Sequence, residues 1–156
     1  MISTKTGDGG QTTWRTIRVN KTSPEIQMLS LFDRAIAETA SARVLARTQG
    51  ASDMLQDQLA RISRILSDVC AMLAANAARD ILTDLIWCDK ITMNFELHEF
   101  VDFGTRSQLA AAINLARTSV RCAETALIDA CDEQDPLIRP LVNRLSDVLF
   151  VLAAQA

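Results

Sequence analysis

The sequence predicts an all-α fold, in which about five helices form a bundle behind an extended N-terminal arm. Hydrophobic residues make up 49% of the 156 residues but aromatic residues only 4%, so the core must consist of aliphatic side chains and alanine. Such small side chains suit closely packed helices. A chain of this length supports one domain over residues 1–156 and is too short for two.

The predicted arm covers residues 1–24, which are polar, rich in glycine and threonine, and without a helical period. No segment here or elsewhere alternates polar and apolar residues clearly enough to predict a strand. The helical bundle is therefore expected to cover residues 25–156.

The first two helices are predicted from apolar residues at three- and four-residue steps. The first runs from Ile26 to about Thr48, and Gly50 marks its end. Ser52 offers the next N-cap, and the second helix follows from Leu55 to an alanine-rich stretch near Ala78.

Three more helices are expected in the rest of the chain. The third covers Ile81 to about Met93, and residues 94–105 form a turn that leads into the fourth. The fourth runs from Ser107 to about Cys131. Asp135–Pro136 begins the last helix, because the fixed φ of proline fits a first helical turn.

Composition argues against several classes of protein. A nucleic-acid-binding protein needs a basic excess to neutralise phosphates, and the formal net charge here is −3. No apolar run is long enough to span a membrane, and no charged segment followed by an apolar one indicates a signal peptide, so we expect a cytoplasmic protein. The four cysteines form no C-x-x-C pair, which favours reduced, mostly packed thiols over disulfides or a zinc site.

Two polar clusters indicate a site for a polyphosphate. The first is the arm segment T-K-T-G-D-G-G-Q-T-T, at Thr4–Thr13. Its glycines permit turns that place successive N–H groups around an anion, its threonines add hydroxyl donors, and Lys5 and Lys21 add positive charge. The segment is not a Walker motif, and a flexible terminus rich in glycine and threonine is the alternative interpretation.

The second cluster lies in the fourth predicted helix, where Arg117, Arg121 and Glu124 project from one face. Asn114 extends this face by nearly one turn. The neighbouring residues are apolar, and buried charges need partners, but a solvated stripe of salt-bridged residues is the alternative. The last helix carries a similar polar segment, N-R-L-S-D from Asn143. This segment belongs either to the same site or to the solvent-exposed face of that helix.

These clusters carry a resemblance that spans nearly the whole chain. The sequence resembles the ATP:cob(I)alamin adenosyltransferases of the propanediol-utilisation type, whose motif T-K-T-G-D-x-G-x-T corresponds to Thr4–Thr12. Four further motifs of that family follow in the right order: R-V-x-K at Arg18–Lys21, part of V-D-E-L-N at Phe32–Arg34, A-R-x-x-x-R-R-A-E-R at Ala116–Thr125, and N-R-L-S-D-x-L-F at Asn143–Phe150.

The resemblance implies an enzyme that transfers the 5′-deoxyadenosyl group of ATP to cob(I)alamin. In this family, five-helix bundles of ferritin-like, up-down arrangement form homotrimers, and each active site lies at a subunit interface. Cobalt in the Co(I) state attacks C5′ of ATP and expels triphosphate, which gives adenosylcobalamin. Mg²⁺ is expected on the ATP phosphates, with no metal ligand from side chains. A flavoprotein reductase and a B12-dependent enzyme are the implied protein partners.

The resemblance also implies which residues form the site. Asp33 and Arg117 correspond to an ion pair that organises the site, and together with Arg121 they are the expected catalytic residues. The expected corrinoid-binding residues are Phe100, Phe103 and Asn114. The expected ATP-binding residues are Thr4, Lys5, Thr6, Gly7, Asp8, Gly10, Thr12, Lys21, Arg121, Glu124 and Asn143.

Departures from the family pattern leave three interpretations open. Two arginines of the fourth-helix motif are replaced by Cys122 and Thr125, and the glutamate and asparagine of V-D-E-L-N by Arg34 and Ile36. A loop that reads F-x-x-P-G-G in the family is F-V-D-F-G-T at Phe100–Thr105. The chain is an active but divergent enzyme, a non-catalytic homologue that binds ATP or a corrinoid as a carrier or regulator, or a structural bundle without ligand.

Overall fold

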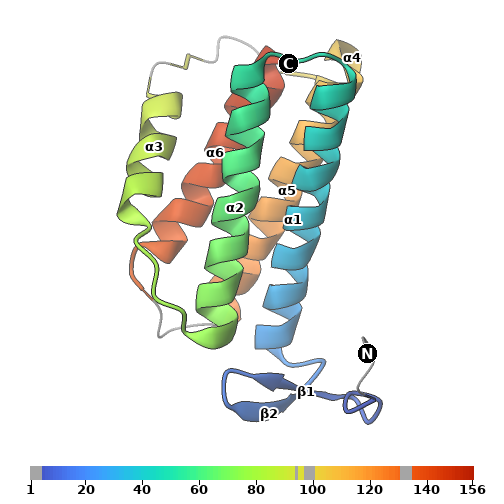
Figure 1. Cartoon of the computed structure of the whole chain (residues 1–156), viewed down its shortest axis with the longest axis vertical. Coiled ribbons are helices and arrows are strands. Elements are labelled where there is room, and N and C mark those ends of the chain that lie inside the picture. Colours follow the sequence, from blue (N-terminus) through green and yellow to red (C-terminus); the bar gives the residue numbers. More distant parts are fainter. Residues whose placement is uncertain (1–4, 94, 97–100, 131–134) are drawn as a thin grey trace.

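The computed structural model describes residues 5–93, 95–96, 101–130 and 135–156, and within these ranges it contains a β-hairpin and six helices. The elements are β1 (Gln11–Trp14), β2 (Ile17–Asn20), α1 (Pro24–Thr48), α2 (Asp53–Ala75), α3 (Leu82–Thr92), α4 (Phe103–Arg106), α5 (Gln108–Ala130) and α6 (Ile138–Gln155). The four long helices α1, α2, α5 and α6 form a bundle, α3 packs against α6, and the hairpin lies at the end where α1 begins (Figure 1). No helix in these ranges is long and apolar enough to cross a lipid bilayer.

The core lies between the four long helices and confirms the predicted aliphatic composition. α1 packs against both α2 and α5, and its fully buried positions include Ala35, Ala42 and Ala46, whose small side chains let neighbouring helices approach closely. The largest fully buried side chains are Met28, Phe32, Leu59, Ile62, Ile65, Leu66, Leu73, Ile113, Leu127, Leu141, Leu145 and Leu149. On α2 the buried apolar residues recur at steps of three and four, as the sequence predicts. On α1, however, Ile36 is only half-buried and Ala40 is exposed, so the buried face of this helix does not follow that periodicity.

The prediction that the arm contains no strand is wrong. β1 and β2 pair in antiparallel register, with Gln11 opposite Asn20 and Trp14 opposite Ile17. No residue of either strand is fully buried, so the sequence lacks the alternation that one buried face would impose. The turn between the strands places Arg15 at φ 52°, and the Arg15 N–H donates to a carbonyl oxygen at the end of α2, at 3.1 Å. This bond ties the hairpin to the bundle.

The second helix ends in the predicted alanine-rich stretch near Ala78. α2 ends at Ala75, because Asn76 takes the left-handed conformation, with φ 52°, that commonly ends a helix. The predicted N-cap is confirmed, since the Ser52 hydroxyl accepts the N–H of Leu55 at 3.3 Å.

The last helix begins later than predicted. α6 starts at Ile138, so Pro136 lies in a turn before the helix and not in its first helical turn. The cause is Asp135, whose carboxylate accepts the N–H of Leu137 at 2.9 Å and whose carbonyl accepts the N–H of Ile138 at 3.0 Å. These two bonds close a turn around the proline.

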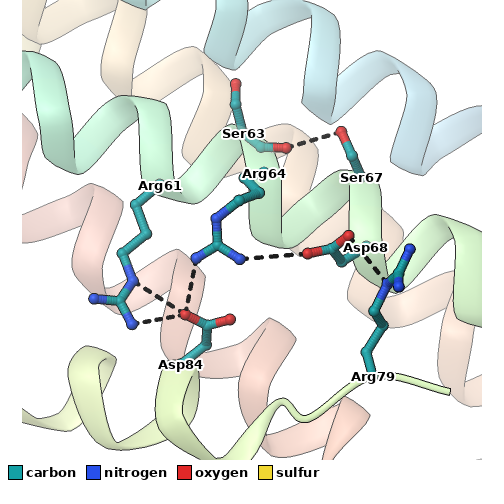
Figure 2. Close-up of polar contacts among 7 residues, drawn as sticks. All are labelled: Arg61, Ser63, Arg64, Ser67, Asp68, Arg79 and Asp84. Carbon is teal, nitrogen blue, oxygen red and sulfur yellow. Dashed lines mark hydrogen bonds and ion pairs between the residues drawn. The ribbon is translucent and has the colours of Figure 1, made fainter.

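Charged side chains fasten α3 to α2 (Figure 2). Asp84 lies in the first turn of α3, and its side chain is only 9% exposed. Its Oδ1 accepts hydrogen bonds from Arg61 Nη2 at 2.7 Å, Arg61 Nε at 3.0 Å and Arg64 Nη2 at 3.2 Å. The Arg61 guanidinium also stacks on Trp87 of α3, 4.5 Å from the ring centroid. The buried carboxylate is therefore satisfied by two arginines of the neighbouring helix.

The described cysteines are all free thiols but differ in exposure. Cys88 on α3 is buried, and this burial is the main cause that raises the pKa of its thiol to about 12. Cys70 is half-buried and Cys122 is exposed, whereas Cys131, the predicted end of the fourth helix, lies outside the described residues.

Thiol labelling should separate these cysteines. At about pH 8, a maleimide should modify Cys122 rapidly and Cys88 only after unfolding, because the reactive species is an accessible thiolate. Since the folded-state pKa of Cys88 lies above its unfolded value, the stability that Cys88 contributes is complete below the unfolded pKa and is lost as the pH rises toward about 12. Peptide mass spectrometry measures the labelling, and fast modification of Cys88 in the native protein would contradict its burial.

Candidate functional site

The glycine-rich segment of the arm folds into a compact turn that the hairpin holds in place. The N–H of Gly10 donates to the carbonyl of Gly7 at 3.1 Å, and the N–H of Asp8 donates to the carbonyl of Lys5 at 3.3 Å. Gly10 has a φ of 78°, which favours glycine, and its carbonyl accepts the N–H of Lys21 at 2.9 Å. This last bond brings the main chain of Lys21 to the turn.

The Lys21 ammonium lies directly against this turn. A Cβ built on Gly7 would lie 3.0 Å from Lys21 Nζ, so the absence of a side chain at Gly7 makes room for the cation. Arg18 of β2 donates through Nη2 to the carbonyl of Thr6 at 3.0 Å. Neither cation forms an ion pair with a carboxylate of the described residues, so both are available to an anion.

Replacing Gly7 with alanine should weaken nucleotide binding without unfolding the protein. The added Cβ displaces the flexible end of Lys21, which moves at little cost to the fold but leaves its place beside the turn. We expect a rise in the Kd for MgATP of about threefold to tenfold, the usual effect of one misplaced charged hydrogen-bond donor. Calorimetric titration of each variant with MgATP measures this Kd. Gly9→Ala is the matched control, because no atom lies within 4 Å of its added Cβ, and equal effects of the two variants would contradict this role of Gly7.

A second polar group lies between α5 and α6. The Asn143 side-chain N–H donates to Glu124 Oε1 at 2.8 Å, which brings together two residues that the sequence predicts as ATP ligands. Arg144 donates to Asn143 Oδ1 at 3.1 Å and to Asp89 of α3 at 2.9 Å. The Asn143 amide is thus oriented from both sides, with Glu124 and Asn143 each only half-buried.

Arg117 and Arg121 differ in their surroundings. Arg117 is half-buried, its Nε donates to Asn114 Oδ1 at 2.8 Å, and its guanidinium lies 5.8 Å from the ring centroid of Phe150. Burial, followed by the like charge of Arg121, lowers the pKa of Arg117. Arg121 is exposed, and no hydrogen bond or ion pair with another described residue holds its guanidinium.

A cavity of about 330 Å³ lies beside Arg117, between α4, α5 and α6. Its lining includes two of the predicted corrinoid-binding residues, Phe103 and Asn114. It also includes Phe150, which ends the motif of the last helix but is not among the predicted site residues. The rings of Phe103 and Phe150 meet edge to face, with centroids 5.4 Å apart. Phe103 is held by α4, a one-turn helix where the sequence predicted only a turn, because Asp102 caps it by accepting the N–H of Gly104 at 3.0 Å.

The structure does not bring all the predicted site residues together within one chain. Asp33 is exposed on α1, and no ion pair among the described residues joins it to Arg117. After burial, the charge of Asp33 is the next cause that raises the pKa of Cys70, so Asp33 lies near α2, whereas Arg117 faces the cavity between α4, α5 and α6. The pair of Asp33 and Arg117 stays a prediction. Thr4 and Phe100 lie outside the described residues.

Comparison with known proteins finds one matching family and solved structures with a similar fold. A family model described as cobalamin adenosyltransferase matches residues 2–156. The chain is 25% identical to an arginine-to-lysine variant of a PduO-type ATP:co(I)rrinoid adenosyltransferase from Lactobacillus reuteri, complexed with ATP, with a TM-score of 0.83 over 97% of this chain and 91% of that one. A phenylalanine-to-alanine variant from the same organism, complexed with cobalamin and ATP, is 24% identical, with a TM-score of 0.85 over 98% and 91%. No curated protein matches this chain in sequence.

Proposed function

Because this chain belongs to the cobalamin adenosyltransferase family, we propose that it transfers the 5′-deoxyadenosyl group of ATP to cob(I)alamin and releases triphosphate. The observation that best supports this function is the aromatic cavity at Phe103 and Phe150. It adjoins Arg117, one helical turn from Arg121, whose guanidinium has no partner among the described residues. An apolar wall suits the edge of a corrinoid, and an unpaired cation suits a polyphosphate. The two substrates would then meet along α5.

The reaction needs no nucleophile from the protein, because the cobalt is one. The electron pair of Co(I) forms a bond to C5′ of ATP while the bond from C5′ to the triphosphate oxygen breaks and leaves its electrons on the triphosphate. The cobalt becomes formally Co(III). The protein contributes by holding both substrates in line and by offsetting the charge that gathers on the leaving triphosphate.

Two groups of described residues would bind the substrates, one in the arm and one along α4, α5 and α6. The turn of the arm, with Lys21 against Gly7, would bind phosphates through its main-chain N–H groups and its cation. Arg121 would bind the leaving triphosphate, and the bonded pair of Glu124 and Asn143 would position the nucleoside. The cavity is too small to enclose a corrinoid, so it would receive one edge of the ring against Phe103 and Phe150.

A homotrimer with shared sites is part of the proposal. The arm docks on the end of α2 and Asp33 lies near the same helix, whereas Arg117, Glu124 and Asn143 lie between α5 and α6. Two groups on different sides of one chain form a single site only if a second copy supplies one of them. Mg²⁺ on the ATP phosphates, a flavoprotein reductase that supplies Co(I), a B12-dependent enzyme that receives the product, and a cytoplasmic location complete the proposal.

An anaerobic assay tests the function directly. The protein is mixed with chemically reduced cobalamin and MgATP, the conversion of cob(I)alamin to adenosylcobalamin is followed by absorbance, and triphosphate is measured separately. Turnover with one triphosphate released per adenosylcobalamin supports the enzyme. MgATP binding by calorimetry without any turnover would contradict it and favour the alternative of a carrier or regulatory protein.

A further inference from the structure

Arg34 on α1 is held by a chain of contacts that crosses to α5. Its Nε donates to Glu38 Oε1 at 2.8 Å, and Glu38 Oε2 accepts a short hydrogen bond from the hydroxyl of Ser119. Ser119 is buried, and the Glu38 side chain is only 18% exposed. The carboxylate that orients the Arg34 guanidinium is therefore itself fixed by the neighbouring helix.

The register of these two helices places Arg34 beside the predicted nucleotide site. α1 and α5 lie side by side and run in opposite directions (Figure 1). Because Glu38 meets Ser119, a residue one turn before Glu38 lies opposite residues about one turn after Ser119, which is where Cys122 and Arg121 lie. The charge of the Cys122 thiolate is a minor cause, after the bond to Glu38, that raises the pKa of Arg34, which agrees with this proximity.

The Arg34 guanidinium has donors to spare. Only its Nε is engaged by another described residue, and 61% of the side chain is exposed. Arg121 is also exposed and without a partner in the described part of the chain, so two arginines with unpaired donors lie on one surface. A planar guanidinium fork is well suited to phosphate oxygens, whereas an exposed pair spaced like Arg34 and Glu38 adds little to helix stability.

We infer that Arg34 binds the triphosphate of the nucleotide, and that it supplies from α1 the cation that the family motif carries on α5 at the position of Cys122. The sequence supports this exchange, since the motif has a glutamate where this chain has Arg34 and an arginine where it has Cys122. The motif thus has its cation on α5, whereas this chain has a cation on α1 and a neutral thiol on α5. The inference rests on the proposed function, because it names a ligand-binding residue of that same site.

Binding of inorganic triphosphate and of adenosine to the whole protein separates this role from a structural one. We expect R34A to weaken triphosphate binding by about tenfold or more, the effect of losing one charge-assisted hydrogen bond, and to leave adenosine binding and the melting temperature unchanged. Adding the second substitution, R34A/C122R, should restore triphosphate binding to within about threefold of the parent. R43A is the matched control, because Arg43 is an exposed arginine farther along α1, and it should bind as the parent does.

Each other outcome counts against a stated part of the inference. Parent-like triphosphate binding by R34A, or an equal loss of adenosine binding, would remove Arg34 from the phosphate site. Weak binding that C122R does not restore would overturn the exchange between the two positions. A parent protein that binds neither MgATP nor triphosphate would overturn the proposed function together with this inference, whereas tight binding by parent and R34A alike would overturn the inference alone.

Discussion

Replacing Arg121 with alanine is expected to lower kcat/KM for MgATP by about 10²–10³-fold, the loss that follows removal of one group that stabilises transition-state charge. Arg121 is exposed and has no partner among the described residues, so its truncation removes no core contact and leaves no buried group unsatisfied. The fold should therefore be unchanged. Negative charge increases on the triphosphate as its bond to C5′ breaks, so the loss should be larger in kcat than in KM.

Three measurements make this expectation decisive. The anaerobic assay gives kcat and KM for Arg121→Ala, thermal unfolding by circular dichroism gives its stability, and light scattering gives the mass of the assembly. R43A serves again as the exposed-arginine control and should retain parent activity. Turnover of Arg121→Ala at more than about a third of the parent rate would remove Arg121 from the machinery.

The largest expected change in stability comes from Asp84. Asp84→Ala should lower the free energy of unfolding by about 3 kcal/mol, the lower limit for breaking a buried ion pair, because Arg61 and Arg64 remain partly in water. The variant loses three hydrogen bonds between α2 and α3. The apolar packing of α3 on α6 remains, so α3 should loosen while the rest of the bundle stays folded.

Urea unfolding and amide hydrogen exchange test this expectation. The amides of α3 should lose protection in Asp84→Ala more than those of α1 and α5. Asp89→Ala is the matched control, because Asp89 lies on the same helix and its pair with Arg144 is exposed, with side chains 56% and 45% exposed, so its loss should cost less than about 1 kcal/mol. Similar costs for the two variants would show that burial of Asp84 contributes little.

The sequence could predict the helices because their burial leaves a periodic trace. Leu59, Ile62 and Leu66 recur at steps of three and four residues, and all three are fully buried. The hairpin left no such trace, because neither of its strands buries a residue completely. The hairpin is held by hydrogen bonds between its two strands and by a main-chain hydrogen bond to α2. Main-chain hydrogen bonds do not require particular side chains, so the sequence gives no sign of them.

The candidate site was predictable in its polar parts and less so in its apolar wall. Glu124 and Asn143 were recognisable as polar residues in apolar helices, and they are hydrogen-bonded to each other. Phe150 looked like one more apolar residue of the last helix, since only the packing of α4 against α5 and α6 turns it toward the cavity. The sequence likewise gave no sign that Asp84 forms a buried ion pair, because its partners lie 20 and 23 residues away on another helix.

The two tryptophans of this chain lie under arginines in separate places. Trp14 belongs to the hairpin and has the Arg15 guanidinium 4.5 Å from its ring centroid, as Trp87 on α3 has that of Arg61. The emission of an indole depends on nearby charge, so the chain carries one built-in fluorescent probe for the arm and another for α3. In a Trp87→Phe variant only Trp14 in the arm would fluoresce. Its emission would then report nucleotide binding by the arm in real time, without any added label.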